Sequence, residues 1–129
     1  MRILSKTISI SRDRANKNKN QRLFASVSFE EGFHFFTESF KYSGFTATSL
    51  FEFAEKIKIV PVQSITYHMH REDFQKWFRN IVRDEMLAKR IEWIKKWPFY
   101  SSDEDLRKEI YKAVSSRIQE LEKTLYRSS

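Results

Sequence analysis

Residues 67–78 read Tyr67-His-Met-His-Arg-Glu-Asp-Phe-Gln-Lys-Trp-Phe78. The stretch combines four large aromatic side chains, two of the three histidines of the chain and the acidic pair Glu72-Asp73. Buried aromatic rings remove large areas from water, so we expect the fold to be built around this stretch. Asp73 is expected to cap a helix that carries Phe74, Trp77 and Phe78. Strands are expected before it and packed helices after it.

The chain of 129 residues has the size of one domain, 1–129. Within it we distinguish a basic β-hairpin arm, residues 1–28, from a mainly helical body, residues 29–129. The absence of cysteine excludes disulfides, a thiol nucleophile and a cysteine zinc site. No apolar run is long enough to span a membrane, and residues 1–28 lack the apolar core of a signal peptide. A cytoplasmic location is therefore expected.

Alternating polar and apolar residues predict strands over Thr7–Ser11 and Leu23–Phe29. They would form a β-hairpin whose long tip, residues 12–22, is basic; a flexible polar loop is the alternative for that tip. A third short strand is expected over residues 32–37, and a fourth is possible over residues 40–45.

Helix signals begin at Ser49, which forms a capping box with Glu52. Val60-Pro61 should end this helix, with Pro61 opening the next one. Residues 61–70 are expected to be helical, although a short strand also fits their pattern. The sequence therefore predicts an α+β fold, mainly α, in which a small antiparallel sheet is followed by four or five packed helices.

The last two helices also have recognisable ends. Asp84 is expected to cap one helix, which Pro98 terminates, and Ser101 to Glu104 form a second capping box. The final helix should pack through one long stripe of side chains: Leu106, Ile110, Val114, Arg117, Leu121 and Leu125.

Several segments together resemble an uncharacterised, mostly archaeal family of domains with no assigned activity. They are Phe33-His-Phe-Phe36, Ser43-Gly44, Ala47-Thr-Ser-Leu-Phe-Glu-Phe53, Ser64-Ile-Thr-Tyr-His68, Arg71-Glu-Asp-Phe-Gln-Lys-Trp77 and Asp84-Glu-Met-Leu-Ala88. The resemblance covers about residues 30–125. It departs from the family pattern at Glu72 and Arg83, where that pattern often has glycine. Some members are attached to larger proteins, which implies an accessory or regulatory role.

The polar residues of the central stretch allow two chemical interpretations. His68 and His70, with His34, could bind a metal if residues 61–70 were a strand, but positions two apart do not share a helix face. Glu72 and Asp73 are two carboxylates beside these histidines and could serve acid–base chemistry, but helix capping by Asp73 explains the same residues. The sequence has no phosphate loop, nucleophile elbow or nucleotide fingerprint. We therefore expect no enzyme activity, metal or cofactor.

Positive charge is concentrated at one end of the chain. Residues 1–22 carry a net charge of +6, against +1 for residues 23–129. Arg and Lys neutralise phosphates and release counterions, so a basic arm on a nearly neutral body is typical of RNA binding. The predicted RNA-binding residues are Arg2, Lys6, Arg12, Arg14, Lys17, Lys19 and Arg22.

The expected function is therefore a non-enzymatic protein that docks on structured RNA within a ribonucleoprotein particle, the ribosome being one candidate. Its partners would be that RNA, ribosomal RNA in the candidate case, and neighbouring proteins, with no membrane and no small-molecule substrate. The rival hypothesis is a protein-binding or regulatory adaptor without a nucleic-acid role. Phe29 to Phe45 include seven phenylalanine and tyrosine side chains. These could form a base-stacking platform, but are more commonly core.

Overall fold

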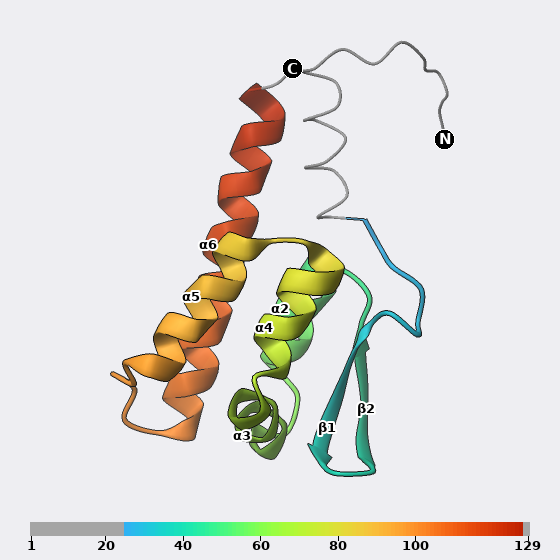
Figure 1. Cartoon of the computed structure of the whole chain (residues 1–129), viewed down its shortest axis with the longest axis vertical. Coiled ribbons are helices and arrows are strands. Elements are labelled where there is room, and N and C mark those ends of the chain that lie inside the picture. Colours follow the sequence, from blue (N-terminus) through green and yellow to red (C-terminus); the bar gives the residue numbers. More distant parts are fainter. Residues whose placement is uncertain (1–24, 128–129) are drawn as a thin grey trace.

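The computed structural model describes residues 25–127, in which a two-stranded antiparallel sheet is followed by packed helices (Figure 1). This confirms the expected α+β, mainly α class. No helix in this range is both long enough and apolar enough to cross a bilayer. The elements in chain order are β1 Phe33–Glu38, β2 Lys41–Ala47, α2 Leu50–Ile57, α3 Val62–Arg71, α4 Asp73–Trp77, the π-helical turn η1 Phe78–Val82, α5 Glu85–Lys96 and α6 Asp103–Arg127.

β1 and β2 form a hairpin at one side of the molecule, joined by the two-residue turn Ser39-Phe40 (Figure 1). The pairing is regular from Phe33 to Phe35 and then skips two residues of β2, so that Phe36 lies opposite Tyr42. Gly44 lies in this bulge with φ 94°, a conformation that glycine adopts without strain. Both strands that the sequence placed here, over 32–37 and 40–45, are confirmed.

The predicted N-terminal hairpin is not seen in the described part of the chain. Residues 7–11 and the basic tip lie outside the described residues, and residues 25–29 of the predicted second strand form no strand. Val27 N–H donates to the Thr48 carbonyl at 2.7 Å, but a tight turn follows at once, in which Gly32 N–H donates to the Phe29 carbonyl. This turn takes the chain away from β2 before a ladder can continue.

Helix α2 begins as the sequence predicts, with one difference. Ser49 Oγ accepts from the Glu52 N–H at 3.1 Å, but the Glu52 carboxylate accepts from the N–H of Thr48, at 2.8 Å, instead of that of Ser49. α3 is a helix, so the strand alternative for residues 61–70 is wrong. It begins at Val62, with Pro61 at the cap position.

The structure confirms the predicted start of α5 and corrects two expectations for α6, its cap and its buried stripe. Asp84 caps α5 as predicted, through an oxygen that accepts from Leu87 N–H. α6 is capped one residue later than expected, because Ser102 Oγ accepts from Asp105 N–H at 3.1 Å. On α6, Ile118 is buried, whereas Arg117 lies at the edge of the stripe and binds Asp84.

The two glycine positions of the resembled family pattern both have a left-handed backbone. Glu72, at the boundary of α3 and α4, has φ 65°, and Arg83, before α5, has φ 66°. Glycine adopts this conformation without a Cβ clash, which explains physically why it suits both positions.

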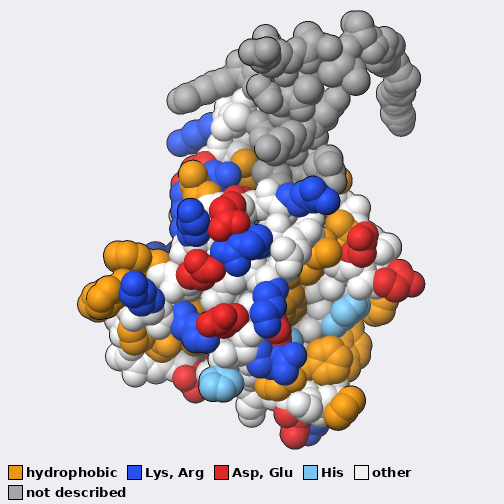
Figure 2. Space-filling model, viewed as in Figure 1, with side chains coloured by type: hydrophobic (Ala, Val, Ile, Leu, Met, Phe, Trp, Pro, Cys, Tyr) orange, Lys and Arg blue, Asp and Glu red, His pale blue; other side chains and the backbone are white. Residues whose placement is uncertain are grey.

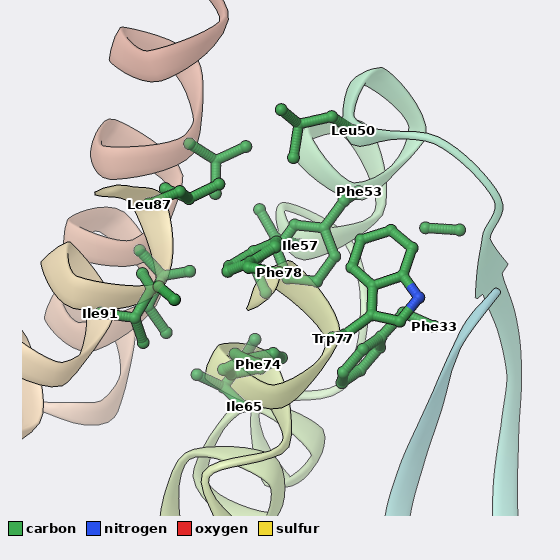
Figure 3. Close-up of a cluster of buried hydrophobic side chains, with 14 of the residues drawn as sticks. Phe33, Leu50, Phe53, Ile57, Ile65, Phe74, Trp77, Phe78, Leu87 and Ile91 are labelled. Atoms are coloured by element: carbon green, nitrogen blue, oxygen red, sulfur yellow. The ribbon is translucent and has the colours of Figure 1, made fainter. Parts of the chain in front are cut away.

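The centre of the core is a cluster of aromatic rings between the hairpin and the helices (Figure 3). Phe53 of α2 lies within 6 Å of the rings of Phe74, Trp77 and Phe78, and stacks on Trp77 at an interplanar angle of 21°. Phe33 of β1 closes the cluster from the sheet side. The aromatic residues Phe74, Trp77 and Phe78 of the stretch 67–78 therefore lie at the centre of the fold, as expected.

Candidate functional site

A cleft of about 680 Å³ lies between the β1–β2 hairpin and helices α3 and α4; we call it the hairpin cleft. Phe36 and Phe40 line its hairpin side, and Tyr67, Arg71, Lys76 and Asn80 line its helical side. Figure 2 shows Lys and Arg side chains on the helical side of this region and hydrophobic side chains over the hairpin. Its volume is within the usual range of ligand sites.

His68 joins the two walls of the hairpin cleft. Its side chain is buried, its Nε2 accepts from the backbone N–H of Phe36 at 2.8 Å, and its Nδ1 lies 2.8 Å from Asp73 Oδ2. A backbone N–H can only donate, so Nε2 carries no proton and Nδ1–H donates to Asp73. Burial lowers the pKa of His68 and outweighs the opposing effect of the Asp73 carboxylate. Neutral His68 thus connects β1 to α4 through these two hydrogen bonds, which we call the His68 tie.

Asp73 serves this tie instead of capping a helix, which corrects the sequence prediction. Its Oδ2 also accepts from Arg71 Nε at 2.9 Å. Glu72 occupies the cap position of α4, and in the described chain that helix start has no side-chain capping bond. Burial raises the pKa of Asp73, but the hydrogen bonds from His68 and Arg71 outweigh it and hold this pKa below its ordinary range. The carboxylate is therefore ionised at neutral pH.

The hydrogen bonds leave little room for catalysis by His68. Both ring nitrogens of His68 are engaged within the protein, so neither can take a proton from a bound molecule. His70 is exposed on the same helix, and His34 Nδ1 is bonded to Thr46 Oγ1 at 2.9 Å. Within residues 25–127, no group of three His, Asp or Glu side chains is placed to hold a metal ion.

A row of rings runs over the hairpin and the turn before it: Phe29, His34, Tyr42 and Phe36. We call this row the aromatic face; His34 and Phe36 also line the hairpin cleft. Neighbouring centroids along the row are 4.7, 6.2 and 5.7 Å apart. Phe29 is 61% exposed and Tyr42 is 44% exposed. The expectation that this aromatic run is core holds for Phe33 and Phe35, which are buried on the other side of β1. Strand alternation is the signal that separates the two sets.

Phe40 lies neither in a strand nor in the core, the two positions that the sequence favoured for it. It stands at the tip of the hairpin, its side chain is 100% exposed, and its backbone has φ 63°. A bulky residue rarely adopts this conformation, which favours Gly or Asn. The sequence placed it at the start of the possible strand over residues 40–45.

The helical side of the hairpin cleft presents hydrogen-bond donors. Lys76 Nζ donates to the Arg71 carbonyl at 3.2 Å, and Arg71 uses Nε for Asp73. Within the described residues, the two terminal nitrogens of Arg71, the Tyr67 hydroxyl and the Asn80 amide have no hydrogen-bond partner in the protein. Lys76 and Asn80 are four residues apart, so the helical spacing places both on the face that borders the cleft.

The predicted RNA-binding residues Arg2, Lys6, Arg12, Arg14, Lys17, Lys19 and Arg22 lie outside the described residues. The hairpin cleft and the aromatic face consist of other residues, so the structure adds a second candidate surface to the one that charge predicted.

The His68 tie predicts a loss of stability in mild acid. The pKa of folded His68 lies below its ordinary value of 6.5, so the unfolded chain takes up this proton first as the pH falls. The stabilising contribution of His68 is present above pH 6.5 and is lost below it. Protonation of Nε2 removes the acceptor of the Phe36 N–H and places two N–H groups against each other. The Asp73 contribution is lost only further down, near and below its ordinary value of 3.8.

Urea unfolding at pH 7.5 and at pH 5.5 measures this effect. His68→Gln is expected to lower the free energy of unfolding at pH 7.5 by about 1–3 kcal/mol and to reduce its dependence on pH in this window. His70 is exposed, so His70→Gln should leave the free energy of unfolding and its pH dependence close to those of the natural chain. An unchanged pH dependence in His68→Gln would contradict the assigned tautomer.

Comparison with known proteins places this architecture in a family. No curated protein and no solved structure matches the chain. A model of a family of unknown function, DUF5752, matches residues 30–128, which include the hairpin cleft, the His68 tie and all the helices described above. The chain belongs to this family of unknown function.

Proposed function

We propose that the protein is a non-enzymatic RNA-binding protein. The observation that carries the proposal is the aromatic face, a row of rings of which Phe29 and Tyr42 are exposed, beside a cleft that Arg71 and Lys76 line. Bases of single-stranded RNA stack on exposed aromatic side chains, and Arg and Lys neutralise the adjoining phosphates. In this proposal the basic arm supplies further phosphate contacts.

The charges of the body support an external partner for the arm. Glu72, Asp84, Glu85, Glu92 and Glu120 are each within 3 Å of a cationic nitrogen of the body. These carboxylates already have partners, so they offer the arm fewer sites for folding back. The net +6 of residues 1–22 then favours binding to a polyanion.

Salt dependence tests the proposal. The full chain is titrated into a fluorescent structured RNA between about 50 and 200 mM salt, the range over which phosphate contacts change affinity steeply. Changing Lys17, Lys19 and Arg22 to glutamine should weaken binding and reduce the slope of log K against log salt by about 2–3. The matched control changes three body cations, Lys56, Lys89 and Lys108, to glutamine. No RNA binding at low salt, or equal loss in both variants, would contradict the role of the arm.

A protein-binding adaptor is the second candidate, and one surface favours it. Trp93, Trp97 and Phe99, at the end of α5 and just after it, are 63%, 45% and 88% exposed. Exposed apolar clusters of this kind mark protein interfaces. A partner protein that survives nuclease treatment and is lost in Trp93→Ser would favour this function over RNA binding.

A further inference from the structure

We propose that the hairpin cleft receives one unpaired nucleotide of RNA, with its base against the hairpin and its phosphate against Arg71 and Lys76. This inference rests on the proposed RNA-binding function and names the ligand of its site. It also predicts a preference that the basic arm alone would not give. A base can enter the cleft only from a single strand, a loop or a bulge.

The hairpin side of the cleft is suited to a base. Phe40 projects from the tip with its side chain fully exposed, while Phe36 lies beside it on the same wall. A phenylalanine that buries no surface contributes nothing to the core, and its φ of 63° adds local strain. Its position is therefore explained by a partner surface that the ring covers. Flat, unpaired bases offer such a surface, whatever their sequence.

The helical side is suited to a phosphate. The Asp73 carboxylate is paired with Arg71 at 2.9 Å, so Lys76 carries the net positive charge of this group. Within the described residues, the terminal nitrogens of Arg71 and the remaining protons of Lys76 have no hydrogen-bond partner in the protein. Both residues line the same cleft, where the Arg71 guanidinium lies over the Tyr67 ring. Guanidinium and ammonium groups side by side bind phosphate oxygens strongly.

Two neutral groups complete the site. The Tyr67 hydroxyl and the Asn80 amide border the space between the two walls, and both can donate and accept hydrogen bonds. The polar edge of a base, or a ribose hydroxyl, presents both kinds of partner. The floor is rigid because Trp77 Nε1–H donates to the Glu31 carbonyl at 2.8 Å, which fixes the indole. The cleft thus offers an apolar wall, an anion site and adaptable polar groups.

The test uses the full chain and two fluorescent probes, an oligouridylate of about 12 nucleotides and an RNA duplex of equal length. We expect tighter binding to the single strand. Phe40→Asn, which suits the left-handed backbone, and Lys76→Gln should each weaken single-strand binding by about 5- to 100-fold. The matched controls are Phe99→Asn, 88% exposed beyond α5, and Lys89→Gln, exposed on α5; both should stay within about 2-fold.

The outcomes separate this inference from the proposed function. Equal binding of both probes, with Phe40→Asn and Lys76→Gln unchanged but the arm variant impaired, would leave RNA binding in place and overturn the cleft as a nucleotide site. Absence of binding to either probe at low salt would overturn both. Displacement of the oligouridylate by an oligoglutamate peptide, with the same dependence on Phe40 and Lys76, would assign the cleft to an acidic polypeptide and overturn the inference.

Discussion

Replacement of Arg117 by methionine is expected to lower the free energy of unfolding by about 3–5 kcal/mol. Asp84 is 3% exposed, and its two oxygens have separate roles. One accepts from Leu87 N–H at 3.1 Å and caps α5, and the other accepts from Arg117 Nε at 2.8 Å. Methionine keeps most of the side-chain volume but leaves the carboxylate buried and without its counter-charge. The cost is therefore that of an unpaired buried charge.

A second substitution tests this cause. Asn caps a helix as well as Asp does and carries no charge, so Asp84→Asn added to Arg117→Met should recover much of the loss. Lys112→Met, which removes an exposed pair with Glu109 at 3.5 Å, should change the stability by less than about 0.5 kcal/mol. Urea unfolding of the four proteins gives the comparison. A loss below about 1 kcal/mol in Arg117→Met would show that water reaches Asp84 and compensates its charge.

The Asp84–Arg117 pair shows which part of the fold can be predicted from the sequence and which part cannot. That Asp84 starts a helix follows from local chemistry, because a short acceptor before an apolar-periodic segment satisfies free N–H groups. That Arg117, 33 residues later, is its partner depends on how α5 packs against α6. Arg117 was accordingly assigned to the apolar stripe, and Ile118, which is buried, was missed. Arg117 turns towards the buried Asp84 carboxylate at the edge of the stripe, and the next residue, Ile118, takes the buried position.

For Asp73, the prediction from local sequence was itself wrong. Its position predicts a cap, but a buried His68 five residues earlier needs an acceptor for Nδ1–H, and that demand decides where the carboxylate goes. The helix start does not require the side chain, since Glu72 adopts the left-handed conformation there. The sequence shows only that His68 and Asp73 are five residues apart. It could not say that the bond would unite the sheet with α4, because the Phe36 N–H that fixes the tautomer comes from the tertiary fold.

The candidate site was only partly predictable. Alternation along β1 separates buried Phe33 and Phe35 from outward His34 and Phe36, and that pattern is present in the sequence. The cleft arises only when the hairpin lies against α3 and α4, which brings Phe40 to the same cavity as Lys76. Charge counting pointed to the basic arm alone, since the body is nearly neutral overall. A nearly neutral total charge does not reveal that Arg71 and Lys76 line the same cleft as Phe40.

Replacement of Phe53 by alanine is the other change expected to have a large effect, about 3–5 kcal/mol in the free energy of unfolding. Phe53 is fully buried and its ring meets the rings of Phe33, Phe35, Phe74, Trp77 and Phe78 at centroid distances of 4.9 to 5.7 Å. Figure 3 shows it between α2 and the rings of Trp77 and Phe78. Removing the ring leaves a cavity that touches both the sheet and the helices.

The choice of replacement shows whether ring geometry or burial dominates. Phe53→Leu keeps most of the apolar volume and loses the ring contacts, so a loss of about 1–2 kcal/mol is expected from it. Phe51→Ala, on the same helix but 40% exposed, should cost less than about 1 kcal/mol. Urea unfolding, with circular dichroism to confirm folding, measures all three. If Phe53→Leu were as damaging as Phe53→Ala, the stacked arrangement itself would stabilise the core more than the area it buries. If Phe53→Ala cost no more than Phe51→Ala, the cluster would not be the centre of the fold.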